Sequence, residues 1–111
     1  MWLITNFGFF SVVQKPGDDL LTVRSRVKAD LEELQNRYIP NLSEILETAD
    51  SDYCYRSRVS KVEFGDSLKK IAMDIDYDNF KNSVYKKQGH TRAGIYGRIW
   101  ELLLNLKKVE V

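Results

Sequence analysis

The first 26 residues alternate between apolar and polar positions in the way that β-strands do. Three short runs, Met1–Thr5, Phe9–Gln14 and Leu20–Arg26, are apolar, β-branched or alternating, and we expect each to form a strand. Asn6-Phe7-Gly8 separates the first two runs, where Asn and Gly tolerate a positive φ, and residues 15–19 contain the Pro-Gly pair of a second turn. This segment therefore predicts an antiparallel meander.

A helical period replaces the alternation after residue 26. Val27, Leu31, Leu34 and Tyr38 recur at the spacing of one helical face. The helix that they predict ends before Pro40, because proline is not tolerated in the interior of a helix.

The alternating pattern returns near the middle of the chain. Ile45-Leu46 is compatible with a short strand, and residues 53–59 alternate again. The two faces of this second segment carry Tyr53, Tyr55 and Val59 on one side and Cys54, Arg56 and Arg58 on the other.

Residues 60–89 predict two helices. Ser60 and Glu63 fit the capping box, in which each side chain satisfies a free backbone amide of the other, so a helix begins there. The apolar stripe of this helix consists of Phe64, Leu68, Ile71 and Ile75. Asp76 or Asp78 is expected to cap a shorter second helix, which Gly89 ends.

The last helix has the widest apolar surface of the chain. Its stripe consists of Ile95, Ile99, Leu102, Leu103 and Leu106, widened by Tyr96 and Trp100. A face this broad normally packs against a sheet. The whole pattern predicts a single α+β domain over residues 1–111, with an antiparallel sheet of about four strands and three to four helices packed mainly on one face.

Composition narrows the class of protein. The chain has 111 residues, of which 43% are hydrophobic, enough for the core of one domain. No apolar run reaches the roughly 20 residues of a membrane span, and no charged segment precedes an apolar stretch at the N-terminus. We therefore expect a soluble cytoplasmic protein with no membrane partner. The single cysteine excludes an internal disulfide and a cysteine-based zinc site.

The sequence contains no recognisable cofactor or metal signature. Neither of the common glycine-rich phosphate-binding motifs occurs. Asp74, Asp76 and Asp78 alternate as in a calcium loop, but Asn79 and Tyr85 occupy the positions at which an EF-hand needs Gly and Glu. We expect neither a cofactor nor a metal ion.

The most unusual charge pattern is a repeated Arg-Ser-Arg. Arg24 and Arg26 end one predicted strand, Arg56 and Arg58 lie in another, and residues two apart in a strand share a face. If the two strands are neighbours, all four guanidiniums lie on the open face of the sheet. They are then either paired with the chain's own 16 Asp and Glu residues, or available to phosphate, nucleic acid or an acidic protein, because Arg matches phosphate bidentately.

These observations favour a non-enzymatic binding module whose four arginines take an anionic partner, although a net charge of +1 argues against coating DNA by charge alone. One alternative is a small enzyme acting on a phosphate-containing molecule, with His90 as its acid or base. Another is an assembly protein that forms a homodimer through its N-terminal hairpin, where Trp2, Phe7, Phe9 and Phe10 are more aromatics than one sheet face needs.

Four segments resemble small bacterial single-domain proteins of unassigned function. They are Met1-Trp2-Leu3, Gly8–Val13, Val23–Val27 and Asp74–Lys81. The resemblance covers most of the chain and implies a bacterial, cytoplasmic protein of one domain. It implies no activity, and it marks Asp74–Lys81 as a shared feature of open role.

Overall fold

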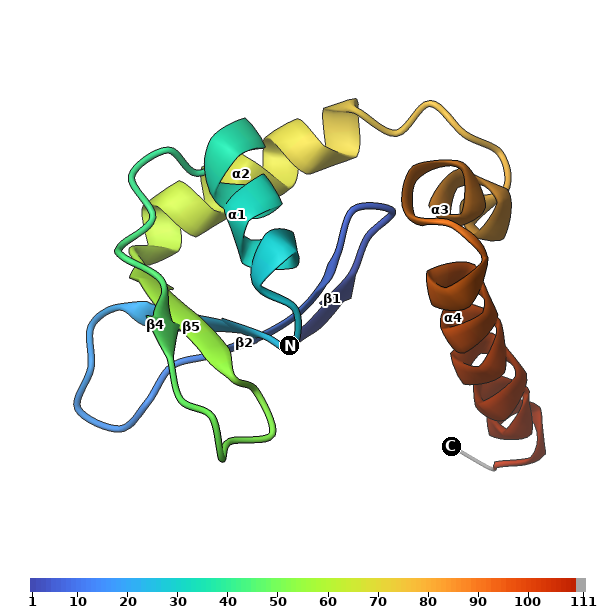
Figure 1. Cartoon of the computed structure of the whole chain (residues 1–111), viewed down its shortest axis with the longest axis horizontal. Helices are drawn as coiled ribbons and strands as arrows, with labels where there is room; N and C mark the ends of the chain where they lie inside the picture. The colour runs from blue at the N-terminus through green and yellow to red at the C-terminus, as the bar shows by residue number, and fades with distance from the viewer. Residues whose placement is uncertain (110–111) are drawn as a thin grey trace. The chain divides into compact units, whose positions relative to one another are not determined.

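The strands expected from the alternating segments pair into one antiparallel sheet in the computed structural model, which describes residues 1–109 (Figure 1). The sheet order is β1-β2-β3-β5-β4. The strands are β1 (Trp2–Ile4), β2 (Phe9–Val13), β3 (Leu21–Ser25), β4 (Leu46–Glu47) and β5 (Tyr55–Val59). The helices are α1 (Lys28–Arg37), α2 (Lys61–Met73), α3 (Phe80–Gln88), α4 (His90–Leu103) and the 3-10 helix η1 (Leu104–Lys108).

The α+β class is confirmed, with five strands rather than about four. The additional strand is β4, whose two residues pair with Tyr55 and Arg56 of β5. The contacts within the chain gather into two compact units, Met1–Asp76 with the sheet, α1 and α2, and Tyr77–Val111 with the remaining helices. A single domain over residues 1–111 stays a prediction.

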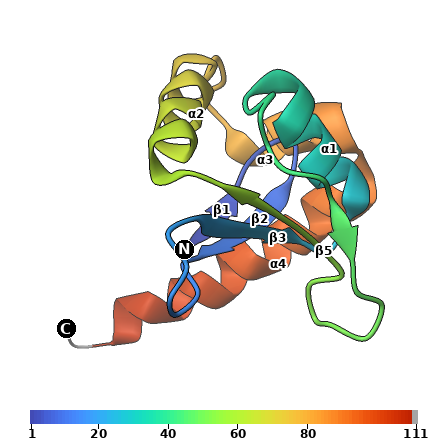
Figure 2. The same cartoon turned by 90° about the vertical axis from the view of Figure 1, so that its left-hand side faces the viewer.

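In the first unit, α1 and α2 lie on the same side of the sheet (Figure 2). The core beneath them is formed by Phe7, Phe10, Val12, Val23, Leu31, Leu34, Tyr38, Ile39, Leu42, Val59 and Phe64. Leu31, Leu34 and Tyr38 are the predicted stripe of α1, and all three are buried. The helical period therefore identified the correct face, while Val27 caps the helix and is 42% exposed.

The turn between β1 and β2 needs glycine for a reason that the sequence did not reveal. Gly8 does not adopt a positive φ. Instead, a Cβ at Gly8 would lie 2.8 Å from Cβ of Asp30 and 2.8 Å from Cζ of Phe10. Asp30 is 3% exposed, and its carboxylate accepts a hydrogen bond from the backbone N–H of Phe9 at 3.0 Å. Close approach of α1 to this turn therefore explains the glycine.

The helix caps confirm one prediction and correct another. Ser60 caps α2, because its Oγ accepts a hydrogen bond from the backbone N–H of Glu63 at 3.1 Å. The other half of the expected capping box differs, since the Glu63 carboxylate accepts from Oγ of Ser60 at 3.4 Å rather than from its backbone N–H. The cap of α3 is Asn79, whose Oδ1 accepts from the N–H of Asn82, and not Asp76 or Asp78. Residues 75–78 are not helical, so the short helix begins one or more residues later than the aspartates suggested. Gly89 ends α3 as expected, with a φ of 88°.

The apolar stripe predicted for the last helix, which the structure divides between α4 and η1, is not buried as the sequence led us to expect. Ile95 is 48% exposed, Leu102 69%, Leu103 54% and Leu106 62%. Within the second unit, the buried side chains of α3 and α4 are instead Ser83, Val84, Ala93 and Tyr96. The buried side chains of α3 and α4 are thus small residues and one aromatic ring.

Candidate functional site

The two Arg-Ser-Arg segments lie in neighbouring strands, as the sequence hypothesis required. In the antiparallel pairing of β3 with β5, Arg24 is opposite Arg56 and Thr22 is opposite Arg58. Val23 and Val59 belong to the core beneath α1 and α2. Because side chains alternate along a strand, the arginines point to the other face of the sheet.

Arg58 is neutralised within the chain. Its Nη2 donates to Oδ1 of Asp18 at 2.6 Å, across 40 residues of sequence. The pKa of Asp18 is lowered, first by a hydrogen bond from the backbone N–H of Leu20 and then by Arg58. For this arginine, pairing with the chain's own carboxylates is the correct interpretation.

Arg24 and Arg56 have only neutral partners. Among residues 1–109 neither forms a salt bridge. Arg24 donates to Oγ of Ser11 at 2.7 Å, and Arg56 donates to Oγ of Ser51 at 3.0 Å. The Nε–H groups of both are buried and find no hydrogen-bond partner in the described part of the chain. Two like charges directly opposite each other and two unsatisfied donors both cost stability.

Arg26 completes the cluster just beyond the end of β3. Its guanidinium carbon lies 4.8 Å from the ring centroid of Tyr53, and that of Arg24 lies 4.7 Å from the same ring. Arg26 donates one hydrogen bond, from Nε to the backbone carbonyl of Asp52 at 3.1 Å, and forms no salt bridge within residues 1–109. Two cations therefore share one aromatic ring, which stabilises each by cation–π attraction without removing its charge.

The position of Tyr53 corrects the sequence analysis, which placed it on the face opposite to the arginines. The strand begins only at Tyr55, and residues 51–53 form a bend. Strand alternation therefore does not extend to Tyr53, whose ring is 5% exposed beneath Arg24 and Arg26. Cys54 lies half-buried in the same loop, with its thiol near the carbonyls of the residues before it.

Two of the four N-terminal aromatics flank this cluster. Phe7 and Phe10 are core residues, at 4% and 0% exposure. Phe9 and Trp2 occupy the other face, where their rings meet edge to face at 5.6 Å, and Phe9 lies 6.2 Å from Tyr53. Trp2 is 67% exposed. We call the surface formed by Trp2, Phe9, Arg24, Arg26, Tyr53 and Arg56 the arginine face.

His90, the candidate acid or base of the enzyme hypothesis, lies in the second unit as the first residue of α4. Its Nε2 is 3.0 Å from the hydroxyl of Tyr85, and the two rings meet edge to face at 4.4 Å. This pairing gives the imidazole an orienting partner. Catalysis by His90 on a phosphate-containing molecule stays a prediction, as does a homodimer through the aromatic N-terminal hairpin.

The structure also bears on metal ions and on membrane spans in the part of the chain that it describes. Residues 1–109 contain no group of three or more His, Cys, Asp or Glu side chains placed to hold a metal ion. None of the helices in that range has both the length and the apolar character needed to cross a bilayer.

The sequence analysis identified the arginines and named Trp2 and Phe9 as surplus aromatics of the hairpin, but it did not place these rings or Tyr53 near the arginines. Tyr53 and Trp2 each lie near a strand end, where alternation no longer indicates the face. The only local sign of this arrangement in the sequence was Tyr53, three positions before Arg56. Comparison with protein-family models, with curated proteins and with solved structures finds no match to this chain, so the geometry of the site carries the functional argument.

Proposed function

We propose that this protein is a non-enzymatic binding module whose arginine face takes a phosphate-bearing partner. The observation that carries the proposal is the contrast among its arginines. Arg58 has a carboxylate partner, whereas Arg24, Arg26 and Arg56 have none in residues 1–109. A cluster of three cations without a counter-charge is costly to the fold, and an anionic partner offsets that cost.

The chemistry of the face favours phosphate over an acidic protein surface. Guanidiniums present planar forks that match phosphate oxygens bidentately. The half-buried ring of Phe9 lies 6.0 Å from the guanidinium carbon of Arg26, and the exposed ring of Trp2 packs edge to face against Phe9. Aromatic side chains next to arginines are the combination with which proteins hold single-stranded nucleic acid, stacking on bases while arginines contact the backbone.

The test is fluorescence anisotropy with a labelled 12-nucleotide oligouridylate in about 50 mM salt, where phosphate contacts contribute most. We expect measurable binding that weakens at higher salt. The triple variant Arg24→Gln/Arg26→Gln/Arg56→Gln should bind at least about tenfold more weakly. Arg26→Gln alone, at an exposed position, should weaken binding about threefold.

Lys28→Gln is the matched control, because it removes one positive charge from an exposed position on α1. It should change affinity less than about twofold, as expected of a charge outside the contact. Wild-type affinity in the triple variant would overturn the proposal. If polyglutamate of the same charge displaces the probe equally well, the partner would be an acidic protein rather than a phosphate-bearing molecule. Thermal melts identify any variant that has unfolded. If the triple variant has unfolded, the affinity of the exposed Arg26→Gln variant tests the proposal instead.

A further inference from the structure

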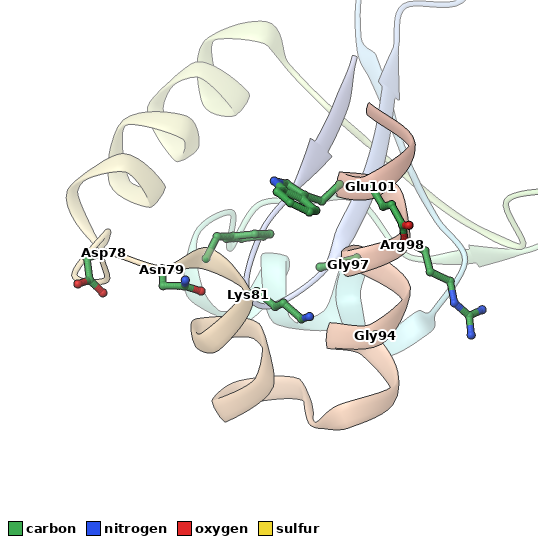
Figure 3. Close-up of a pocket in the computed structure, with 10 residues that line it drawn as sticks. Asp78, Asn79, Lys81, Gly94, Gly97, Arg98 and Glu101 are labelled. Carbon is green, nitrogen blue, oxygen red and sulfur yellow. The ribbon is translucent and has the colours of Figure 1, made fainter. Parts of the chain in front are cut away.

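The second unit contains a cleft between α3 and α4 (Figure 3). Its volume is about 720 Å³, within the range of roughly 300–1,000 Å³ that is typical of small-molecule sites. The lining residues are Asp78, Asn79, Phe80, Lys81, Gly94, Tyr96, Gly97, Arg98, Trp100 and Glu101.

Aromatic rings form the apolar part of the cleft. Phe80 and Tyr96 are stacked with an interplanar angle of 6° and a centroid distance of 6.1 Å. Tyr96 is 8% exposed, and its hydroxyl accepts a hydrogen bond from Arg92 at 3.3 Å, so the ring is fixed in position. Trp100 also lines the cleft but is 67% exposed. The cleft therefore offers an apolar, planar aromatic surface to a ligand.

Two glycines keep the α4 side of the cleft open. Gly94 and Gly97 both lie inside a helix, where glycine costs about 1 kcal/mol relative to alanine. A Cβ at Gly94 would meet nothing within 4 Å. A Cβ at Gly97 would lie 3.4 Å from Nζ of Lys81. The absence of a side chain thus leaves open space at Gly94 and leaves room for the ammonium group of Lys81 at Gly97.

Lys81 is the cation that points into this space. In Figure 3 it extends from α3 toward α4, whereas Arg98 extends away from α3. Lys81 has no salt bridge or hydrogen bond within residues 1–109. The two lining carboxylates, Asp78 and Glu101, balance the two lining cations in formal charge. The cleft therefore offers one unpaired positive group without a strongly positive environment.

We propose that this cleft binds a small planar aromatic carboxylate. The carboxylate accepts hydrogen bonds from the ammonium of Lys81, and the ring packs against Trp100 above the open position at Gly94. A single negative charge matches the single inward cation. A phosphate monoester, with about two negative charges, would be repelled by Asp78 and Glu101. This site shares no residue with the arginine face, and the proposal does not depend on the function of that face.

The probe for the test is 2-naphthoate, titrated into the full-length ¹⁵N-labelled protein and followed by NMR chemical-shift changes. We expect saturable shifts at residues of the cleft. Lys81→Met, which keeps the aliphatic stem, should weaken binding by about tenfold, as expected for the loss of a charge-assisted hydrogen bond. Lys87→Met is the matched control on the same helix and should bind as the wild type does.

A steric variant separates binding from folding. Gly94→Leu places a side chain in open space, so it should abolish binding of 2-naphthoate while the protein remains folded by thermal melt. Two further ligands test the charge argument: neutral 2-naphthalenemethanol and 2-naphthyl phosphate should each bind more weakly than 2-naphthoate. Absence of saturable binding, wild-type affinity in Lys81→Met, or tighter binding of the phosphate would overturn the proposal.

Discussion

Asp18 decides how much positive charge the β3–β5 surface presents. Its carboxylate holds Arg58 at 2.6 Å, and its side chain is only 20% exposed. The same carboxylate accepts a hydrogen bond from the backbone N–H of Leu20 at 2.9 Å. An amide could keep the backbone contact and would no longer neutralise the guanidinium.

Asp18→Asn should therefore tighten binding of the oligouridylate probe, by about threefold at low salt, because one local negative charge is removed and Arg58 becomes available. The measurement is the anisotropy titration described above. Asp19→Asn, an equal change of charge at the neighbouring exposed residue, is the control. Equal effects of the two substitutions would assign the gain to net charge rather than to the release of Arg58.

Tyr38 is the residue whose titration is most clearly perturbed. Burial is the largest cause and the hydrogen bond to the carboxylate of Asp74, at 2.7 Å, is the next, and together they raise the pKa of Tyr38 to about 12. The phenol is 6% exposed. Because the protonated form is favoured in the folded state, the associated stability is fully present below pH 10 and is lost as the pH rises toward 12.

We predict that absorbance at 295 nm shows one phenol that ionises near pH 12, and that this last step is absent in Tyr38→Phe. The difference in unfolding free energy between the two proteins should be constant from about pH 7 to about pH 10, the ordinary tyrosine pKa, and should shrink above it. A late step that persists in Tyr38→Phe would show that another tyrosine is responsible.

At the scale of elements, the packing of α1 against the β1–β2 turn leaves no space at Gly8. Gly8→Ala should lower the unfolding free energy by about 1–3 kcal/mol, because its Cβ would overlap Asp30 and the ring of Phe10. Urea denaturation measures the change. Gly65→Ala in α2 is the matched control of opposite sign: its Cβ meets nothing within 4 Å, so it should stabilise the protein by about 0.5–1 kcal/mol through helix propensity. A neutral Gly8→Ala would contradict close approach as the reason for this glycine.

At the scale of the whole molecule, positive and negative charges almost cancel, with 17 Lys and Arg against 16 Asp and Glu. Such a protein has no strong long-range field, so any affinity for an anion must come from local arrangement. The two proposed sites achieve this in different ways. The arginine face gathers three cations without counter-charges in the first unit, whereas the cleft of the second unit directs one lysine into a neutral aromatic surface.

Local patterns in the sequence predicted the elements and the faces of most of them. Strand alternation placed Arg24 and Arg56 on the side away from Val23, and the helical period found the buried stripe of α1. The capping box located the start of α2. These predictions succeed because the period of side chains along a strand or helix is a local property of the backbone.

The contacts between distant residues depend on how the whole chain packs. Because β3 and β5 are neighbours in the sheet, Arg24 lies opposite Arg56. The ion pair with Asp18, 40 residues away in sequence, removes Arg58 from the cluster. The loop before β5 brings Tyr53 under two arginines, against the expected alternation. Strand order, loop paths and helix packing follow from the free energy of the whole packed chain, which no local pattern of residues contains.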